Sequence, residues 1–410
     1  MKWSKYNFSW SQDETFFHYN SIYNTILITE KELQMPFETE IQAQLEENGF
    51  LLADEIQEES VAKQKIEEKL HSSDTLSCWI FVTNDCNLAC PYCFEKDSLS
   101  NSRPEYMDKE MCERTVIWLT AKARELNVKK IHVTLTGGEP LMNVPAMEMI
   151  AALLRKTELI VTMNVITNGV LLDRTIAKQL YQHNISSYQI TIDGPSKIHD
   201  ARRQYKDGSG TFSTILNNIL KIRQWNNQIC FVIRINVDQQ NYKEIIKLLT
   251  LLKKLQLEKF LAICMNDTIT DGMPHPDVLS EIVKIISQAQ ADGFNIAFGE
   301  LNNCWMMSEY WYMVNVNGDI YKCPSLVGRK QYCVGNVESK KLTSQYQEQM
   351  NLAPWESCMN CNLVGLCCGG CPYRCILNST QSGHKKVCRK DYLEALLKIK
   401  YKELENKMGS

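Results

Sequence analysis

The chain has 410 residues, of which 44% are hydrophobic and 23% charged, and its 45 basic and 48 acidic side chains give a formal net charge of −3. This length predicts two or three domains, and the near balance of charge, with no basic block, argues against a nucleic-acid partner. No segment is long and apolar enough for a membrane span or a secretion signal, so we expect a cytoplasmic protein with no membrane partner. In a reducing compartment, its 17 cysteines indicate metal ligands rather than disulfides.

The first 75 residues predict a small α+β region. Residues 16–29 alternate enough to suggest a pair of strands, and residues 37–50 and 58–70 have helical patterns with a short strand at 51–55 between them.

Six apolar segments rich in Ile and Val follow, separated by helical patterns such as 108–127, 211–226 and 241–256. Strands that are apolar on both faces are typical of a buried parallel sheet, and repeated βα units predict an α/β fold. Six units are fewer than the eight of a complete barrel, so we expect a partial (βα)6 TIM-like barrel. The predicted strands are 77–83, 129–136, 158–167, 186–193, 228–237 and 258–265.

From about residue 301 the chain is rich in loops and cysteines, and it ends in a charged helical pattern near 390–407. The sequence therefore predicts three consecutive domains, at 1–75, 76–300 and 301–410.

Three cysteines directly follow the first predicted barrel strand, in the pattern C-x3-C-x2-C. Thiolates of Cys86, Cys90 and Cys93 can bind three irons of a [4Fe–4S] cluster and leave the fourth iron open to a small molecule. A closed zinc site would need a fourth ligand, and no histidine lies near. A zinc site or incidental buried thiols remain the alternatives.

This motif, with Tyr92 before its third cysteine, resembles that of the radical S-adenosylmethionine (radical SAM) superfamily. The downstream order strengthens the resemblance, because a Gly-Gly-Glu-Pro segment follows the second predicted strand and Asn168 follows the third. Arg234 lies inside the fifth strand, where it could pair with the carboxylate of the cofactor or form a structural ion pair. The resemblance implies that S-adenosylmethionine binds Tyr92, Gly137, Gly138, Glu139, Pro140, Asn168, Asp193 and Arg234. It also implies reductive cleavage of that cofactor to a 5′-deoxyadenosyl radical, which abstracts hydrogen from a substrate.

A second set of seven cysteines resembles the SPASM extension of radical SAM enzymes, which binds auxiliary clusters. The resemblance implies that Cys358, Cys361, Cys367 and Cys388 hold a distal cluster, and that Cys304, Cys323 and Cys371 hold a nearer one. We therefore expect three [4Fe–4S] clusters. Some relatives supply an eighth cysteine shortly before the first of these, and this sequence has none there. The remaining candidates for that ligand are Cys264, Cys333, Cys368 and Cys375, and each could instead be a buried or free thiol.

SPASM enzymes mostly act on peptides, so the resemblance implies a maturase of a ribosomally made precursor peptide. Residues 1–75 would then be a winged-helix-like module that grips the leader of the precursor, or else a structural cap. Without an eighth cysteine, the nearer auxiliary cluster would keep an open iron that could bind a substrate thiolate, which favours a thioether cross-link from a precursor cysteine. We expect a flavodoxin- or ferredoxin-type reductant. The alternatives are a carbon–carbon cross-link, epimerisation, an anaerobic sulfatase-maturing enzyme that forms formylglycine, or a non-catalytic electron carrier. Asp193, Asp319 and Tyr321 are candidates for proton transfer.

Overall fold

The structure is a computed structural model that describes residues 1–93, 103–267, 276–301, 304–339, 341–373, 376 and 388–408. Its contacts divide the chain into two compact units. The sheet unit comprises Ser73–Ala297 and Ser308–Met350, and the terminal unit comprises Met1–Ser72, Phe298–Met307 and Asn351–Ser410.

The sheet unit is built on one ten-stranded sheet in the order β12-β11-β10-β9-β8-β7-β6-β13-β14-β15. Strands β6 to β11 are parallel neighbours, which confirms the six predicted βα units. The elements are β6 (Thr75–Phe81), α4 (Lys109–Glu125), β7 (Lys130–Thr136), α5 (Val144–Leu154), β8 (Ile160–Thr167), α6 (Arg174–Tyr181), β9 (Ser187–Thr191), α7 (Ser196–Arg202), α8 (Phe212–Trp225), β10 (Cys230–Val237), α9 (Ile245–Lys254), β11 (Leu261–Asp267), α10 (Pro276–Ala291) and β12 (Asn295–Ile296).

Three further strands extend this sheet beyond β6, within the segment that the sequence predicted to be mainly loops. They are β13 (Trp311–Val314), β14 (Asp319–Tyr321) and β15 (Gly335–Asn336), and α11 (Ser344–Met350) follows them. β13 is parallel to β6, whereas β14 and β15 are antiparallel additions. Strands of two to four residues carry too little periodicity to be recognised in a sequence.

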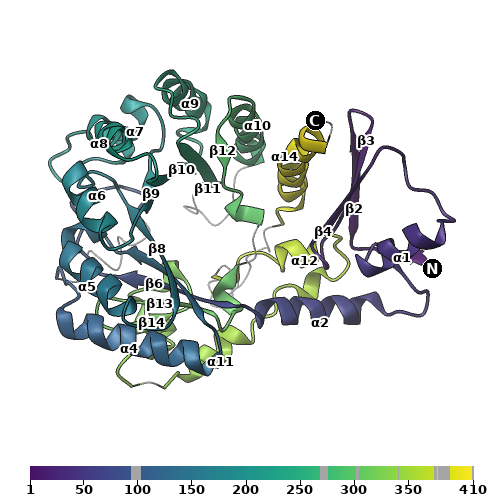
Figure 1. The fold of residues 1–410 in the computed structure, drawn as a ribbon, viewed down its shortest axis with the longest axis horizontal. Helices are drawn as coiled ribbons and strands as arrows, with labels where there is room; N and C mark the ends of the chain where they lie inside the picture. Colours follow the sequence, from purple (N-terminus) through teal and green to yellow (C-terminus); the bar gives the residue numbers. More distant parts are fainter. Residues whose placement is uncertain are drawn as a thin grey trace. The chain divides into compact units, whose positions relative to one another are not determined.

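One face of the parallel sheet is apolar and packs under helices. Ile80 of β6, Val133 of β7 and Ile233 of β10 are fully buried on it, and Figure 1 shows α4 to α10 around the outside of the sheet. Burying each such side chain contributes about 1.5–3 kcal/mol.

Side chains along each strand point alternately to the two faces of the sheet. The face opposite the helices, which we call the inner face, carries mainly polar side chains. Trp79, Thr134 and Asn164 lie in register across β6, β7 and β8, and the hydroxyl of Thr134 donates to Oδ1 of Asn164 (2.7 Å). Two residues closer to the start of these strands, Nδ1 of His132 and the hydroxyl of Thr162 form a hydrogen bond of 2.8 Å. The sheet thus presents a row of neutral hydrogen-bonding groups away from its helices.

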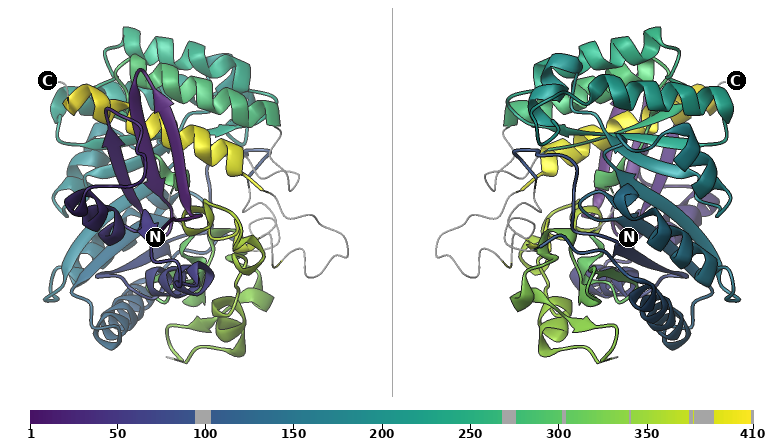
Figure 2. Two further views of the ribbon diagram at one scale, coloured as in Figure 1. Left: turned by 90° about the vertical axis from the view of Figure 1, so that its right-hand side faces the viewer. Right: turned by 90° about the vertical axis from the view of Figure 1, so that its left-hand side faces the viewer.

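The terminal unit contains segments from both ends of the chain. Its three-stranded antiparallel sheet, β2-β3-β4, is crossed by the C-terminal helix, as the purple strands and yellow helix in Figure 2 show. Tyr19 of the sheet packs against Tyr401 of that helix, with ring centroids 6.2 Å apart. The elements are β1 (Lys2–Trp3), β2 (Asn7–Gln12), β3 (Thr15–Asn20), β4 (Thr25–Thr29), α1 (Thr39–Glu47), β5 (Leu51–Leu52), α2 (Glu58–Leu70), α12 (Val364–Cys367) and α14 (Lys390–Met408).

A shared core explains why these segments form one unit rather than two consecutive domains. Ala62, Ile66 and Leu70 of α2 pack with Trp355 and Val364 from the cysteine-rich segment. The predicted boundaries at 75 and 301 lie close to divisions at 72 and 297, but residues 308–350 belong to the sheet unit and residues 351–410 join residues 1–72. The functions suggested for those regions stay predictions.

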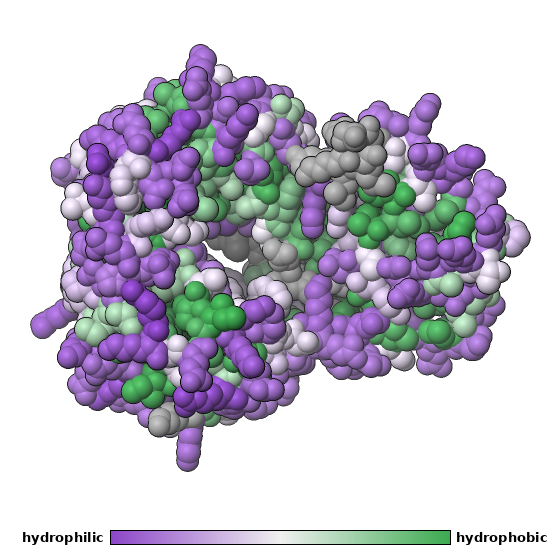
Figure 3. Space-filling view, in the orientation of Figure 1, coloured by the Kyte–Doolittle hydropathy of each residue, from purple (hydrophilic) through white to green (hydrophobic). Residues whose placement is uncertain are grey.

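Short 3-10 turns connect several elements. They are η1 (Pro140–Asn143), η2 (Tyr242–Glu244), η3 (Gly299–Leu301), η4 (Trp305–Met307), η5 (Pro324–Leu326), η6 (Lys330–Tyr332) and η7 (Glu356–Cys358). None of the helices among the described residues has the length and hydropathy needed to cross a membrane. In Figure 3 the visible surface over the sheet unit's helices is mainly hydrophilic, with separate apolar patches.

Candidate active site at the carboxyl edge of the sheet

The three-cysteine motif lies in the loop that leaves the carboxyl end of β6. Burial raises the pKa of the Cys86 thiol to about 12, and the nearby Glu139, Cys90 and Cys93 act in the same direction. Among the described residues, no three metal-binding side chains already surround a common point. A bound cluster would therefore require these thiols to turn toward one another, and its positive irons would offset their mutual repulsion.

Two glycines after β7 let the chain pack directly against this loop. A Cβ added to Gly137 would overlap the carbonyl oxygen of Thr83, and one added to Gly138 would overlap that of Asp85. Because these Cβ atoms are absent, the two segments approach closely enough for backbone hydrogen bonds. The N–H of Gly138 donates to the carbonyl oxygen of Thr83 (3.1 Å), and the N–H of Glu139 donates to that of Asp85 (2.8 Å). The glycines thus fix the start of the cysteine loop on the sheet edge, a role the sequence did not suggest.

The side chains of Glu139 and Asn168 complete this attachment. The Glu139 carboxylate is fully buried and accepts from the hydroxyl of Thr167 (2.7 Å) and the N–H groups of Asn168 (2.7 Å) and Leu141 (3.0 Å). The Nδ2 of Asn168 donates to Asn87 (2.8 Å), between the first two motif cysteines. Burial raises the pKa of Glu139, although these hydrogen bonds oppose the shift.

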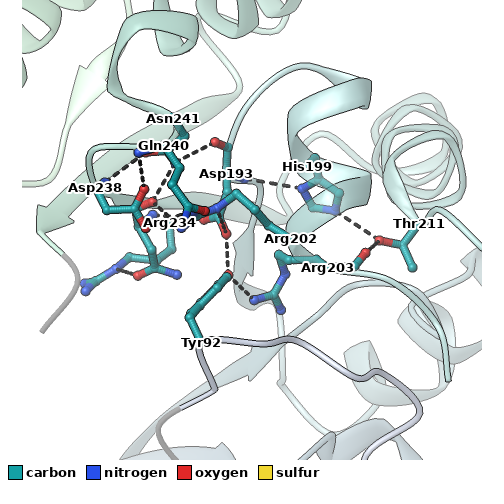
Figure 4. Close-up of polar contacts among 11 residues, drawn as sticks. Tyr92, Asp193, His199, Arg202, Arg203, Thr211, Arg234, Asp238, Gln240 and Asn241 are labelled. Atoms are coloured by element: carbon teal, nitrogen blue, oxygen red, sulfur yellow. Dashed lines mark hydrogen bonds and ion pairs between the residues drawn. The ribbon is translucent and has the colours of Figure 1, made fainter. Parts of the chain in front are cut away.

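Tyr92 links the cysteine loop to the end of β9. Its hydroxyl donates to the carboxylate of Asp193 and accepts from Nη1 of Arg203 (2.8 Å), as Figure 4 shows. The guanidinium of Arg202 lies 4.7 Å from the Tyr92 ring centroid. Asp193 also accepts from Nε of Arg202 (3.4 Å) and the N–H of Asn236 (3.0 Å), so both its oxygens are used.

One hydrogen-bond donor in this network is left over. The Nε of Arg203 is buried and has no hydrogen-bond partner among the described residues. A buried guanidinium N–H without an acceptor is costly, so this position suits an anionic ligand group. The donors present therefore fit a ligand that carries a carboxylate beside the cysteine loop.

Comparison with known proteins agrees with this geometry. The family model described as "Radical SAM superfamily" matches residues 80–252, which contain the cysteine motif and the strands that position it. Residues 80–252 are therefore a radical SAM domain.

Individual relatives are distant. An uncharacterized protein of Methanocaldococcus jannaschii is 27% identical, with 63% of this chain and 87% of that protein covered. The radical SAM cyclopropyl synthase TigE of Paramaledivibacter caminithermalis is 23% identical, with 71% of this chain and 66% of the synthase covered. The solved structure "Native anSMEcpe with bound AdoMet" shares the fold, with a TM-score of 0.63 and 21% identity over 82% of this chain and 100% of that one.

Behind the radical SAM site, His199 of α7 holds the turn after β9. Its Nδ1 accepts from the N–H of Asp193 (3.3 Å), so Nε2 carries the proton and faces the hydroxyl of Thr211 (3.0 Å). Burial, assisted by the charge of Arg203, lowers the pKa of His199 to about 4.

This shift predicts a loss of stability in mild acid. Because the folded pKa lies below the ordinary value, folding favours neutral His199, and its contribution is complete above about pH 6.5 and falls as the pH drops toward 4. We expect the free energy of unfolding to decrease by about 1 kcal/mol more between pH 7.5 and 5.5 in the natural protein than in His199→Gln. Anaerobic urea unfolding at both pH values measures this difference, and equal pH dependence of the two proteins would refute it.

Arg203 is the site residue that the sequence did not single out. The predicted cofactor-binding residues include neither Arg203 nor the adjacent Arg202, because a pattern cannot tell which of two neighbouring arginines faces a ligand. α7 ends at Arg202, and Arg203 leaves helical geometry with φ −135°, which turns it toward Tyr92. Arg234, by contrast, makes no bond to Tyr92 in Figure 4.

Two of the candidates for proton transfer lie in a hairpin at the far end of the sheet. Asp319 binds Nζ of Lys330 (2.8 Å) and Nδ2 of Asn336 (3.0 Å). Burial works to raise the pKa of Asp319, but these partners outweigh it and lower that pKa. Tyr321 is 1% exposed, and burial raises its pKa far above the usual range. Their contacts are those of structural residues.

The terminal unit brings four of the predicted auxiliary ligands together. Burial raises the pKa of Cys367, and the charges of Cys358, Cys361 and Cys388 act in the same direction, so these thiols share one region although they do not surround a common point. These are the four cysteines expected to hold the distal cluster.

The three cysteines predicted to hold the nearer cluster belong to different units, and that cluster stays a prediction. Cys304 and Cys371 belong to the terminal unit and Cys323 to the sheet unit. Of the candidates for a fourth ligand, Cys333 is buried and donates to the carbonyl of Gly335 (3.0 Å), and Cys368 is buried near Cys304. Cys375 lies outside the described residues.

Proposed function

We propose that this chain is a maturase that oxidises a ribosomally made precursor peptide and forms a thioether cross-link from a cysteine. The cysteine loop carries the proposal, because it is fixed by Gly138, Glu139 and Asn168 beside an arginine with an unused donor. Named relatives support a peptide substrate, since they include TigE and the sporulation killing factor maturation protein SkfB of Bacillus subtilis. This chain spans 66% and 42% of their lengths.

In this proposal, the cofactor site lies between the cysteine loop and the ends of β7 to β10. When bound, a [4Fe–4S] cluster on Cys86, Cys90 and Cys93 supplies the electron that cleaves S-adenosylmethionine to a 5′-deoxyadenosyl radical. The carbonyl oxygens of the Gly137–Pro140 segment accept from the ammonium of the cofactor. Arg203 offers its free Nε to the carboxylate, a role that the sequence assigned to Arg234.

The surrounding residues orient these groups rather than react. Tyr92, Asp193 and Arg202 form a saturated network that fixes one wall of the site, and Asn168 holds the loop from the other side. Such fixed positions reduce the reorganisation needed when the radical meets its substrate. We propose a flavodoxin- or ferredoxin-type protein as the electron donor.

We propose that the terminal unit binds the precursor, and two features of this unit support that role. Among the described strands, β4 has one hydrogen-bonded neighbour, β3, so its other edge can add an extended peptide. The four clustered cysteines would hold the distal auxiliary cluster beside this module. With the nearer one, the total proposed is three clusters.

The product is tested by mass spectrometry. The substrate to be tested is any short Cys-containing peptide that is found encoded beside this gene. It is co-expressed anaerobically with the enzyme and then analysed with and without thiol alkylation. We expect a loss of two hydrogens per link together with one alkylatable thiol, and no recovery of that thiol on reduction. Hydrogen loss with every thiol still alkylatable would reject the thioether and leave a carbon–carbon or carbon–oxygen bond.

A second candidate is formylglycine formation. A cysteine-type anaerobic sulfatase-maturating enzyme of Clostridium novyi is 23% identical, with 71% of this chain and 86% of that enzyme covered. The same experiment separates the two, because formylglycine loses the cysteine sulfur and gains an aldehyde that a hydrazide reagent captures.

A further inference from the structure

The inner face of the parallel sheet carries one guanidinium whose contacts are all neutral. Arg234 of β10 lies in register between Thr191 of β9 and Cys264 of β11. Its Nε donates to Oδ1 of Asn236 (3.1 Å), and its Nη1 lies 3.8 Å from the sulfur of Cys264. Within the part of the chain that the structure describes, no carboxylate forms an ion pair with Arg234.

The two neighbouring arginines, Arg202 and Arg203, already have partners within the cofactor network. Arg202 is paired with Asp193 and with Asp238 (2.8 Å), whereas Arg203 reaches Tyr92 of the cysteine loop. Figure 4 shows both, and no bond joins either Tyr92 or Asp193 to Arg234. A carboxylate at the cofactor position therefore has Arg203 as its partner, which leaves the charge of Arg234 unassigned.

Arg234 also lies deeper along the sheet than the cofactor network. The N–H of Asn236 binds Asp193, and Arg234 precedes Asn236 by two residues, which is about 6.6 Å along a strand. Since the cysteine loop follows the carboxyl ends of the strands, Arg234 is one pleat further from it. That displacement puts Arg234 where a substrate, rather than the cofactor, would meet the inner face.

The rest of this face gives a substrate neutral partners. Thr134, Asn164 and Gln189 offer hydroxyl and amide groups, and burial lowers the pKa of His132, so that it is neutral at pH 7. Along the described strands β6 to β11, the inner-face positions that share this register hold no Asp or Glu. Among the described inner-face residues of these strands none can neutralise Arg234, so a carboxylate of the substrate would be a suitable partner.

We propose that Arg234 is a specificity-determining residue that binds a carboxylate of the peptide substrate. The carboxylate belongs to an Asp or Glu side chain close to the modified residue, or to the C-terminus of the peptide. A guanidinium binds a carboxylate through two parallel hydrogen bonds, and the neutral surroundings strengthen this pair relative to water. This inference rests on the proposed function, because it requires a peptide substrate.

The test pairs changes in the enzyme with changes in the peptide. The probe is the Cys-containing peptide encoded beside this gene, made with each Asp or Glu replaced in turn by Asn or Gln, and separately with a C-terminal amide. We expect one of these neutral peptides to lower kcat/KM by about 10- to 100-fold with the natural enzyme, as loss of a charged hydrogen-bonded pair predicts. With Arg234→Gln, the acid and amide forms of that position should differ less than about 2-fold.

Arg223→Gln is the matched control, because Arg223 lies on α8, where it contacts Leu255 and Phe260. It should keep the full preference for the acid. The peptide position whose neutral form lowers kcat/KM identifies which carboxylate Arg234 binds, that of a side chain or that of the C-terminus. Equal rates for all peptides with the natural enzyme, or a preference that persists in Arg234→Gln, would overturn the inference while leaving the maturase intact. If the natural enzyme modifies no form of the peptide, the proposed function fails and this inference fails with it.

Discussion

Replacing Cys86, Cys90 and Cys93 together with alanine is expected to abolish 5′-deoxyadenosine formation. The three thiols are the only cysteines in the loop that Gly138, Glu139 and Asn168 fix to the sheet edge. Without them no iron can be held beside Arg203 and Tyr92, so the cofactor is neither bound at a metal nor reduced. Anaerobic incubation with dithionite and S-adenosylmethionine, followed by chromatography, measures the product, and iron analysis is made on the same sample.

The iron analysis distinguishes this loss from unfolding. If the two proposed auxiliary clusters are present elsewhere, the triple variant should retain about two-thirds of its iron. Cys230→Ala is the control, because Cys230 is an exposed thiol at the start of β10, and it should match the natural protein in both assays. Continued cleavage of S-adenosylmethionine by the triple variant would show that the cluster assignment is wrong.

Asp193→Ala is expected to lower the free energy of unfolding by about 3–5 kcal/mol, the usual cost of removing one partner of a buried ion pair. Asp193 is fully buried and accepts from the side chains of Tyr92 and Arg202 and from the N–H of Asn236. Alanine would leave the N–H of Asn236 without its acceptor and would remove one of the two carboxylates paired with Arg202, so that Asp238 remains. Anaerobic urea unfolding followed by circular dichroism gives the change.

The same substitution should slow cofactor cleavage, because Tyr92 loses the carboxylate that fixes the cysteine loop to β9. Glu67→Ala is a suitable control, since Glu67 is an exposed carboxylate on α2 and alanine is compatible with its helix. It should change stability by less than about 0.5 kcal/mol. A destabilisation below about 1 kcal/mol for Asp193→Ala would mean that this network does not support the fold.

The central fold was predictable because buried parallel strands have a strong sequence signature. All six segments rich in Ile and Val became neighbouring parallel strands in chain order. The helices at 58–70 and 390–408 were also found close to their predicted positions. In contrast, β13 to β15 are too short to be predicted from the sequence. They form because the edge of β6 supplies backbone hydrogen-bond partners for β13, on which β14 and β15 then build.

The site was predictable in its residues but less so in what they contact. Glu139 and Asn168 were expected to contact the cofactor, which stays a prediction, and the structure adds that their side chains tie the cysteine loop to β8. A motif shows that a residue type is needed at a position, and it does not distinguish contact with a ligand from support of a loop. The importance of Arg203 depends on where α7 stops, which the sequence of two arginines does not reveal.

The shared core of the terminal unit has a consequence for how the protein is made. Helix α2 leaves the ribosome early, yet Trp355 and Val364, which cover its apolar side, are synthesised almost 300 residues later. At roughly 5–20 residues per second, Ala62, Ile66 and Leu70 wait about 15–60 s for their partners. During translation the apolar side of this helix is therefore exposed and can bind chaperones. A chain released from a ribosome that stalls within the sheet unit lacks the residues that complete the core of the terminal unit.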